Sequence, residues 1–323
     1  MMRKLYCRML EKLSGIDFDA IFPGFHPFRF ALYNDERIWL DNKDIPWEEG
    51  FYGNTTIYFE NQHIAIWHVD FDVNNVDEDL FAANLVHEMF HAFQRDKELV
   101  SQYPNDLEIL RYPDDEINYY AKKAENEMLA ESFGASLERK SKLYQMIRAS
   151  RELRSQRIGD LVHQEELVEQ HEGMAEYAGC MALRQLDEDK FNKKIEGYAK
   201  ILQEDNIQFF DIRRMGYYSG TLMRLLEQEI GNTNSMEKWI QNYKKSKEDK
   251  LEAFFKEETV YTAADGFICG YDPMNQIRVK DQILASRFIM ISVNGEKKKI
   301  QGPVVLDMKP QKANEVSGYY IHP

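Results

Sequence analysis

The segment His87-Glu88-Met89-Phe90-His91 has the residue types and the spacing of a metal site. On an α-helix, positions four apart are offset by about 40°, so His87 and His91 leave one face at adjacent turns. Two imidazole nitrogens placed in this way can bind one ion. Glu88 lies about 100° from His87, beside the ion rather than on it.

This arrangement predicts hydrolytic chemistry. Two histidines and one further carboxylate leave a coordination position open for water, which is the pattern of catalytic zinc. Glu88 can take a proton from that water, which then attacks a peptide carbonyl polarised by the metal. Glu88 passes the proton to the leaving amine. The sequence therefore predicts a zinc-dependent peptidase with Glu88 as general base.

The third ligand must come from a downstream glutamate. Gln94 and Arg95 follow the motif, which excludes the longer histidine pattern of metzincins. The first candidate segment is LVEQHEGMAEYAG at 167–179, where small residues such as Gly173 allow helices to approach closely. Four glutamates in or near it are predicted to share one helical face: Glu165, Glu169, Glu172 and Glu176.

A second segment, ENEMLAESFGASLE at 125–138, offers an alternative third ligand. Glu127 and Glu131 share a helical face in this segment, again beside small residues. Spacing and composition alone leave both segments open as the source of the ligand.

HEMFHAFQ followed by EGMAEY resembles the gluzincin group of metallopeptidases, in which a glutamate of an EGxAEY-like helix is the third zinc ligand. The resemblance implies a zincin-like fold and zinc as the cofactor. It also implies that Glu172 is the ligand and that Glu176 is a carboxylate behind the ligands. The helices near 115–158 would then be an insertion between the two ligand helices.

Another part of the chain is similar to the NExxxD-x-FG element of thermolysin-like enzymes. Asn126-Glu127, Glu131 and Phe133-Gly134 carry this similarity, which would make Glu127 the ligand. Because the whole EGMAEY string matches, Glu172 is the favoured ligand.

A tyrosine can complete the predicted site. Oxyanion stabilisation commonly comes from Tyr, His or Arg side chains. RRMGYYSG at 213–220 places Tyr217 and Tyr218 beside Gly216 and Gly220 on a predicted helix. One of these two tyrosines is expected to face the zinc, whereas the more common role of a helical tyrosine is in a core.

Strands and helices must position these residues. Residues 28–42 and 54–70 each predict two strands, with turns at Asn34-Asp35 and Asn61-Gln62. In gluzincins an edge strand ahead of the zinc helix pairs with substrate, which makes 64–67 the expected edge. Asp77 is the predicted cap of a helix that runs to about Lys97. Further helices are predicted near 115–158, 160–186, 188–203, 206–229 and 235–245.

The last part of the chain alternates like strands, with Asn294-Gly295 as a hairpin turn. We therefore predict an α+β chain with a mainly helical, zincin-like metallopeptidase domain at 1–270 and a small β subdomain at 271–323. Within the first domain, β-hairpins are expected at 28–70 and helices at 78–256.

Composition narrows the classes of partner. The 323 residues include 41 basic and 55 acidic side chains, a formal charge of -14 that repels nucleic acid and anionic membranes. No stretch approaches the roughly 20 apolar residues of a spanning helix. Three scattered cysteines fit a reducing compartment, so we expect a cytoplasmic protein that acts on a peptide or protein substrate. Substrate sequence, end or internal cleavage and oligomeric state are not indicated.

Rival functions remain open at the same site. A zinc centre of this kind could hydrolyse a non-peptide amide, and two histidines with one carboxylate can also hold the iron of an oxygenase. An inactive, metal-binding interaction protein is a third class. Glu88 argues against the last two, because neither needs a carboxylate beside the metal.

Overall fold

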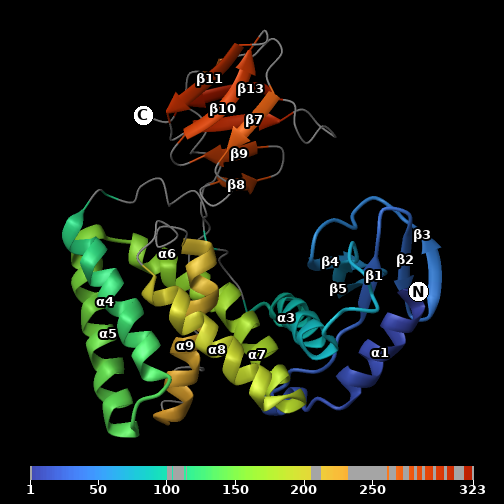
Figure 1. Cartoon of the computed structure of the whole chain (residues 1–323), viewed down its shortest axis with the longest axis horizontal. Coiled ribbons are helices and arrows are strands. Elements are labelled where there is room, and N and C mark those ends of the chain that lie inside the picture. Colours follow the sequence, from blue (N-terminus) through green and yellow to red (C-terminus); the bar gives the residue numbers. More distant parts are fainter. Residues whose placement is uncertain are drawn as a thin grey trace.

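A computed structural model describes residues 2–99, 104, 113, 115–204 and 212–231, together with strand segments between 260 and 321. The chain is a mixed α+β protein, as predicted, with helices dominant after the first sheet (Figure 1). None of the described helices is both long and apolar enough to cross a bilayer.

The N-terminal sheet contains both predicted hairpins. Its five strands are β1 (Phe30–Tyr33), β2 (Arg37–Leu40), β3 (Lys43–Pro46), β4 (Thr55–Phe59) and β5 (Gln62–His68). Their order is β3-β2-β1-β5-β4, with β1 and β5 parallel and the other neighbours antiparallel. Glu60 and Asn61 form the β4–β5 turn with positive φ angles, so this turn begins one residue earlier than predicted.

The edge strand beside the helices is β4, and the prediction of 64–67 as the edge is wrong. β5 pairs with β4 on one side and with β1 on the other, so both of its edges already have a strand partner. The hydroxyl of Thr56 on β4 donates a hydrogen bond to the backbone carbonyl of Glu88 at 2.6 Å. This bond ties the sheet edge to the helix that carries the predicted metal ligands.

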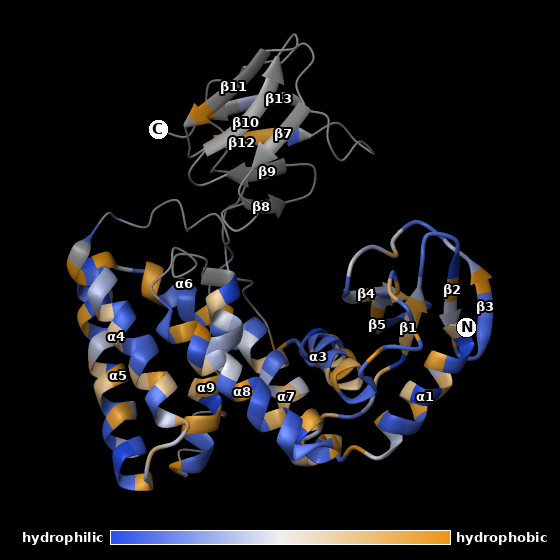
Figure 2. Cartoon of the chain, in the orientation of Figure 1, coloured by the Kyte–Doolittle hydropathy of each residue, from blue (hydrophilic) through white to orange (hydrophobic). Residues whose placement is uncertain are grey.

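The two faces of the sheet pack against different partners. Phe30 and Leu32 face helix α1 (Met2–Ser14) and helix α3 (Glu78–Asp96), whereas Ala31 and Tyr33 belong to a second cluster with Phe51. This alternation follows from the pleat of a strand. Hydrophobic and hydrophilic positions also alternate along α1, as expected for a helix with one buried face (Figure 2).

Helix α3 lies in the middle of the fold. The side chain of Asp77 caps it by accepting from the backbone N–H groups of Asp79 and Leu80, which confirms the predicted start. From Phe81 to Gln94 nearly every side chain is buried, because the sheet lies on one side and helix α7 (Met174–Leu186) on the other (Figure 1). Its histidines are therefore held by the core.

Most of the remaining helices form a group beyond α3, whereas the short helix α2 (Phe18–Ile21) follows α1 and contacts α7. The group consists of α4 (Glu116–Ser132), α5 (Leu137–Ile158), α6 (Leu161–Val168), α8 (Glu188–Gln203) and α9 (Ile212–Glu229). The predicted 115–158 segment is two helices, since Ser136 caps a new one with its side chain. The 160–186 segment contains a π-helical stretch, η2 (Glu169–Gly173), between α6 and α7. The predicted helix at 235–245 lies outside the described residues.

The C-terminal strands begin earlier than the predicted boundary at 271. They are β6 (Val260–Tyr261), β7 (Phe267–Tyr271), β8 (Gln276–Val279), β9 (Gln282–Ala285), β10 (Phe288–Val293), β11 (Glu296–Gln301), β12 (Val304–Met308) and β13 (Val316–Ile321). They form two sheets, β11-β10-β7 and β6-β13-β12-β9-β8. Val293 pairs with Glu296 around the predicted hairpin turn, whose two residues lie outside the described ones. In the described part of the chain, these strands pair only with each other.

Candidate metal centre

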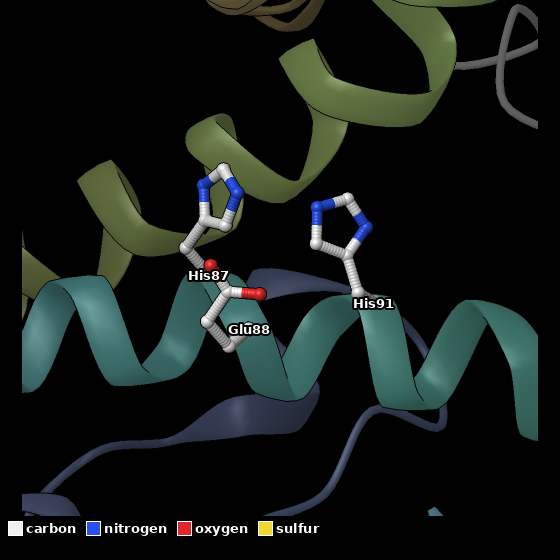
Figure 3. Close-up of side chains that lie close together, drawn as sticks. All are labelled: His87, Glu88 and His91. Carbon is white, nitrogen blue, oxygen red and sulfur yellow. The ribbon is translucent and has the colours of Figure 1, made fainter. Parts of the chain in front are cut away.

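His87, Glu88 and His91 lie together on α3, and all three are buried. Figure 3 shows both imidazole rings pointing from α3 toward the neighbouring helical segment. One ligand atom from each of the three residues lies within 4.8 Å of the others. The helical offset inferred from the sequence therefore brings these three side chains into one buried group.

Glu172 approaches both histidines from the segment between α6 and α7. Its Oε2 atom lies 3.2 Å from Nε2 of His91 and 3.9 Å from Nε2 of His87. The alternative ligand, Glu127, is exposed on α4, which packs against α5, α8 and α9 rather than α3. Of the two candidate segments, the structure brings only the first to the histidines.

The separations of these atoms fit a metal ion. Zinc binds His nitrogen and carboxylate oxygen at about 2.0–2.2 Å, so tetrahedral ligand atoms lie roughly 3.3 Å apart. The distances from Glu172 to the two histidines, 3.2 and 3.9 Å, are near that value. Glu172 is therefore a candidate ligand of an ion together with His87 and His91.

The Nδ1 atom of each histidine ring already has a hydrogen-bond partner. Nδ1 of His87 lies 2.8 Å from the carboxylate of Glu176, and Nδ1 of His91 lies 2.8 Å from Oε1 of Gln94. The amide N–H of Gln94 donates to the backbone carbonyl of His171, which sets the orientation of the amide. Since carboxylate and amide oxygens are acceptors, each Nδ1 would keep its proton when an ion binds, and each Nε2 would then offer a lone pair to the ion.

Glu176 is held in turn by helix α8. Lys194 lies 2.7 Å from its Oε1 atom, and the hydroxyl of Tyr198 donates to the same oxygen. Burial alone would raise the pKa of Glu176, but Lys194 and His87 lower it well below its usual value. For His87, burial opposes protonation, but Glu176 and the other nearby carboxylates raise its pKa overall. The carboxylate behind His87 is therefore ionised.

The π-helical stretch divides the predicted acidic stripe. Glu165 and Glu169 point to buried arginines, whereas Glu172 and Glu176 reach the histidines of α3. A π-turn has more residues than an α-turn, so residues after it are rotated relative to residues before it. The prediction that all four share one face assumed an uninterrupted α-helix and is wrong for that reason.

Glycines bring the ligand segment close to its neighbours. A Cβ atom on Gly173 would lie 2.7 Å from the carbonyl oxygen of Gly216 and from Cα of Gly220. A Cβ atom on Gly179 would lie 2.7 Å from the carbonyl oxygen of Ala83 on α3. Only glycine permits backbones to approach so closely. The small residues singled out in the sequence thus set the helix spacing at the site.

A buried ion cluster holds the other side of the π-helical stretch. Arg151 on α5 lies 2.8 Å from Glu169, and the hydroxyl of Ser219 on α9 donates to the same carboxylate at 2.7 Å. The cluster also contains Lys122, Glu125, Arg154 and Glu165, all buried. Because buried charges need partners, this cluster orients the helices around η2.

A cavity of about 250 Å³ adjoins the metal group. Its wall includes Glu88, His91, Glu172 and Tyr217, and on the sheet side Thr55 of β4. The ring of Tyr217 stacks on that of His87, with 5.6 Å between centroids. Of the two predicted tyrosines, Tyr217 therefore lies at the site. Tyr218 instead packs on Tyr198, with ring centroids 4.7 Å apart.

Sequence reasoning assigned no role to His171, yet this residue lines the same cavity. Its Nδ1 atom is 3.5 Å from Glu172, and its ring centroid is 4.6 Å from that of His91. Burial and the nearby His91 lower its pKa to about 4, so its ring is neutral near pH 7. An ordinary helical offset from Glu172 would turn it away, but His171 belongs to the π-helical stretch.

Arg95 was also missed as a site residue. It lines the cavity and donates to the backbone carbonyl of Thr56 at 2.6 Å. The signal was its spacing, since Arg95 lies seven positions after Glu88 and therefore on the same side of α3.

No protein family, curated protein or solved structure matches this chain. Within the described residues, the group of His87, Glu88 and His91 can hold a metal ion. A second group of potential ligands shares His91 and adds His171 and Glu172.

Proposed function

We propose that this chain is a zinc-dependent peptidase with a zincin-like fold and Glu88 as its general base. The proposal is supported chiefly by one observation: Glu172, from a distant segment, lies within 4 Å of both His87 and His91 while Glu88 lines the adjoining cavity. A structural metal site would not require the carboxylate of Glu88.

Zinc suits the donor set. Two neutral imidazoles and one carboxylate are ligands that zinc accepts, and three protein ligands leave a position open. The acceptors behind both rings resemble the outer partners of metal-binding histidines, which hold the ring orientation. The order of sheet, zinc helix and ligand helix also agrees with the gluzincin resemblance.

Each residue at the site would have a separate role in the reaction. When bound, the zinc ion would lower the pKa of a coordinated water and polarise a carbonyl group of the substrate. Glu88 would accept the proton of the attacking water and later deliver it to the leaving nitrogen. Tyr217 and His171, both at the cavity wall, would donate hydrogen bonds to the substrate's carbonyl oxygen.

The edge of β4 offers a place for an extended peptide. Asn54 and Thr55 line the cavity at the start of this strand, and among the described strands one side of β4 has no neighbour. An extended peptide can pair with such an edge through its backbone. Arg95 holds the edge in place through its bond to Thr56.

The proposal is tested by measuring zinc content and peptide-library cleavage for the wild type and two variants. Glu88→Gln should keep the metal but lower kcat by at least about a hundredfold, because the general base is lost. Glu172→Gln should lose most of the metal, because a charged ligand is replaced by a neutral amide.

Glu127→Gln is the matched control, since Glu127 is exposed on α4 and should change neither property. Zinc retention by Glu172→Gln together with loss of zinc from Glu127→Gln would reverse the ligand assignment. A wild type that binds zinc but cleaves no peptide would overturn the peptidase assignment and leave a metal centre of another function.

A further inference from the structure

A second, larger cavity of about 690 Å³ lies at the end of the N-terminal sheet. β1 and β5 run parallel, so Tyr33 and His68 stand side by side where both strands end. The loop of residues 47–54 and the segment 70–71 after β5 complete the wall. Its volume is in the range of cavities that bind small ligands or side chains.

This cavity adjoins the metal centre. Asn54 lines both the larger cavity and the smaller one beside Glu88 and His91. The side-chain oxygen of Asn54 accepts a hydrogen bond at 2.9 Å from the backbone N–H of His68, which fixes the residue between the two spaces. A peptide lying along the start of β4 at the metal centre would therefore reach the larger cavity with a nearby side chain.

The wall of the larger cavity is aromatic and held in shape. Tyr33 donates to the carbonyl of Gly53 at 2.8 Å, and the indole N–H of Trp47 donates to the carbonyl of Phe51 at 3.2 Å. Tyr52 packs edge-on against Trp47 with 5.6 Å between ring centroids, while its own side chain is 62% exposed. These contacts within the protein hold the loop 47–54 over the strand ends. The aromatic rings therefore line the cavity before any ligand binds.

Besides His68, the ionisable side chains of the wall that carry charge are acidic. Asp35 and Asp70 line the cavity, and its described lining contains no lysine or arginine. Both carboxylates are exposed; Asp35 lies 3.2 Å from Nε2 of His68, and Asp70 forms no ion pair with a described residue. Aromatic faces and carboxylates both attract cations.

We propose that this cavity is a specificity subsite that takes a basic side chain of the substrate, lysine or arginine, near the cleaved bond. The inference rests on the proposed peptidase function and adds the chemical class of the substrate. The apolar stem of such a side chain would pack on the aromatic wall, and its charged end would reach Asp35 and Asp70. A neutral aromatic side chain could pack on the aromatic wall, but it would offer no charge to the carboxylates of Asp35 and Asp70.

The test uses N-acetylated, C-amidated octapeptides of alanine in which a single arginine occupies each position in turn. Matched sets carry norleucine, phenylalanine or glutamate instead of arginine. We expect the wild type to prefer arginine at one fixed position. For that peptide, the Asp35→Asn/Asp70→Asn double variant should raise KM by about tenfold and leave kcat within about twofold. The norleucine peptide should show no such change.

Two further variants test whether the effect on KM comes from this cavity. Tyr52→Ala, at an exposed ring, should also raise KM for the arginine peptide, because it removes a cation–π contact without disturbing the core. Glu36→Gln is the matched control, since Glu36 is an exposed neighbour of Asp35 that does not line the cavity. An equal rise in KM in the control would assign the effect to the general negative field and overturn the subsite.

Failure of the subsite and failure of the peptidase function are separable. If the wild type cleaves peptides but prefers phenylalanine, or is indifferent to arginine, the cationic subsite is overturned while the peptidase stands. If no peptide is cleaved, binding of the same octapeptides to the Glu88→Gln protein is measured by calorimetry. Arginine-selective binding that the double aspartate variant loses would support the cavity assignment, and unselective binding would overturn it.

Discussion

Each histidine of α3 directs one ring nitrogen toward Glu172 and the other toward an acceptor on the opposite side of the ring. For His87 that acceptor is Glu176, which Lys194 holds from a third helix. Metal-binding histidines need such partners because the ring must present an unprotonated nitrogen in a fixed direction. Orientation of the candidate ligands thus depends on residues that never touch the ion.

Replacement of Glu176 tests this dependence. Glu176→Ala should weaken zinc affinity by about ten- to a hundredfold, because His87 loses the acceptor that fixes its tautomer. Glu176→Gln should recover part of the loss, since an amide oxygen can still accept from Nδ1. Zinc affinity is measured by competition with a chromophoric chelator.

The control for this series is Glu196→Gln on α8, an exposed position that should retain wild-type affinity. Wild-type affinity in Glu176→Ala would show that His87 does not need this acceptor. An equal loss in Glu176→Ala and Glu176→Gln would point to the negative charge rather than the hydrogen bond.

The helices around the site meet at unusually short distances. η2 crosses α9 where Gly173 faces Gly216 and Gly220, and α7 meets α3 at Gly179. The π-helical turn rotates Glu172 into the site, and the close approach of these backbones sets its depth. Element geometry therefore decides whether the glutamate can reach the histidines.

Gly173→Ala should disturb this geometry. The added methyl group would lie 2.7 Å from backbone atoms that cannot swing away, so we expect a loss of about 1–3 kcal/mol in the free energy of unfolding. Zinc affinity should fall as well, because Glu172 is the adjacent residue. Denaturant unfolding of the apoprotein and the chelator competition measure the two effects.

Gly197→Ala on α8 is the matched control. A Cβ atom there meets nothing within 4 Å, and replacing a glycine inside a helix stabilises it by up to about 1 kcal/mol. If Gly173→Ala were as stable as Gly197→Ala and bound zinc normally, close backbone packing would not control the site.

At the scale of the whole molecule, a buried cluster of charges joins the helices that surround the ligand segment. Lys122 of α4 lies 2.9 Å from Glu165 of α6, and Arg154 of α5 contacts both Glu165 and Glu125. The cluster contains three cations and three carboxylates that are buried, so its charges balance. Removing one partner leaves another charge unpaired in the interior, which is costly.

The cluster should make stability depend on pH above neutrality. Burial and the nearby Arg154 lower the pKa of Lys122 from 10.5 to about 8. Between these two values the unfolded chain binds more protons than the folded protein, so the free energy of unfolding rises with pH. Relative to Lys122→Met, the wild type should gain on the order of 2 kcal/mol between pH 8 and about pH 10.

Denaturant unfolding of both proteins across this pH range measures the gain. Comparison with Lys122→Met removes the contributions of titrating groups outside the cluster, which are common to both. Parallel curves would contradict the lowered pKa, and a wild type that loses stability relative to the variant would reverse its sign.

The local features of the site could be predicted from the sequence. The spacing of His87 and His91 within one helix, the cap at Asp77 and the hairpin strands all depend on neighbours along the chain. The EGMAEY string indicated the segment that the structure brings to the histidines, because a short motif keeps its residue types wherever the fold places it. These features are set by helix and strand periodicity.

Only the tertiary structure decided the rest. The parallel pairing of β1 and β5 made β4 the edge strand, and this pairing joins residues far apart in sequence. The π-helical turn turned His171 into the site and divided the acidic stripe, because packing against α9 and the buried cations outweighs local helix geometry. The cavity beside Asn54 likewise exists only where the two strand ends and a distant loop meet.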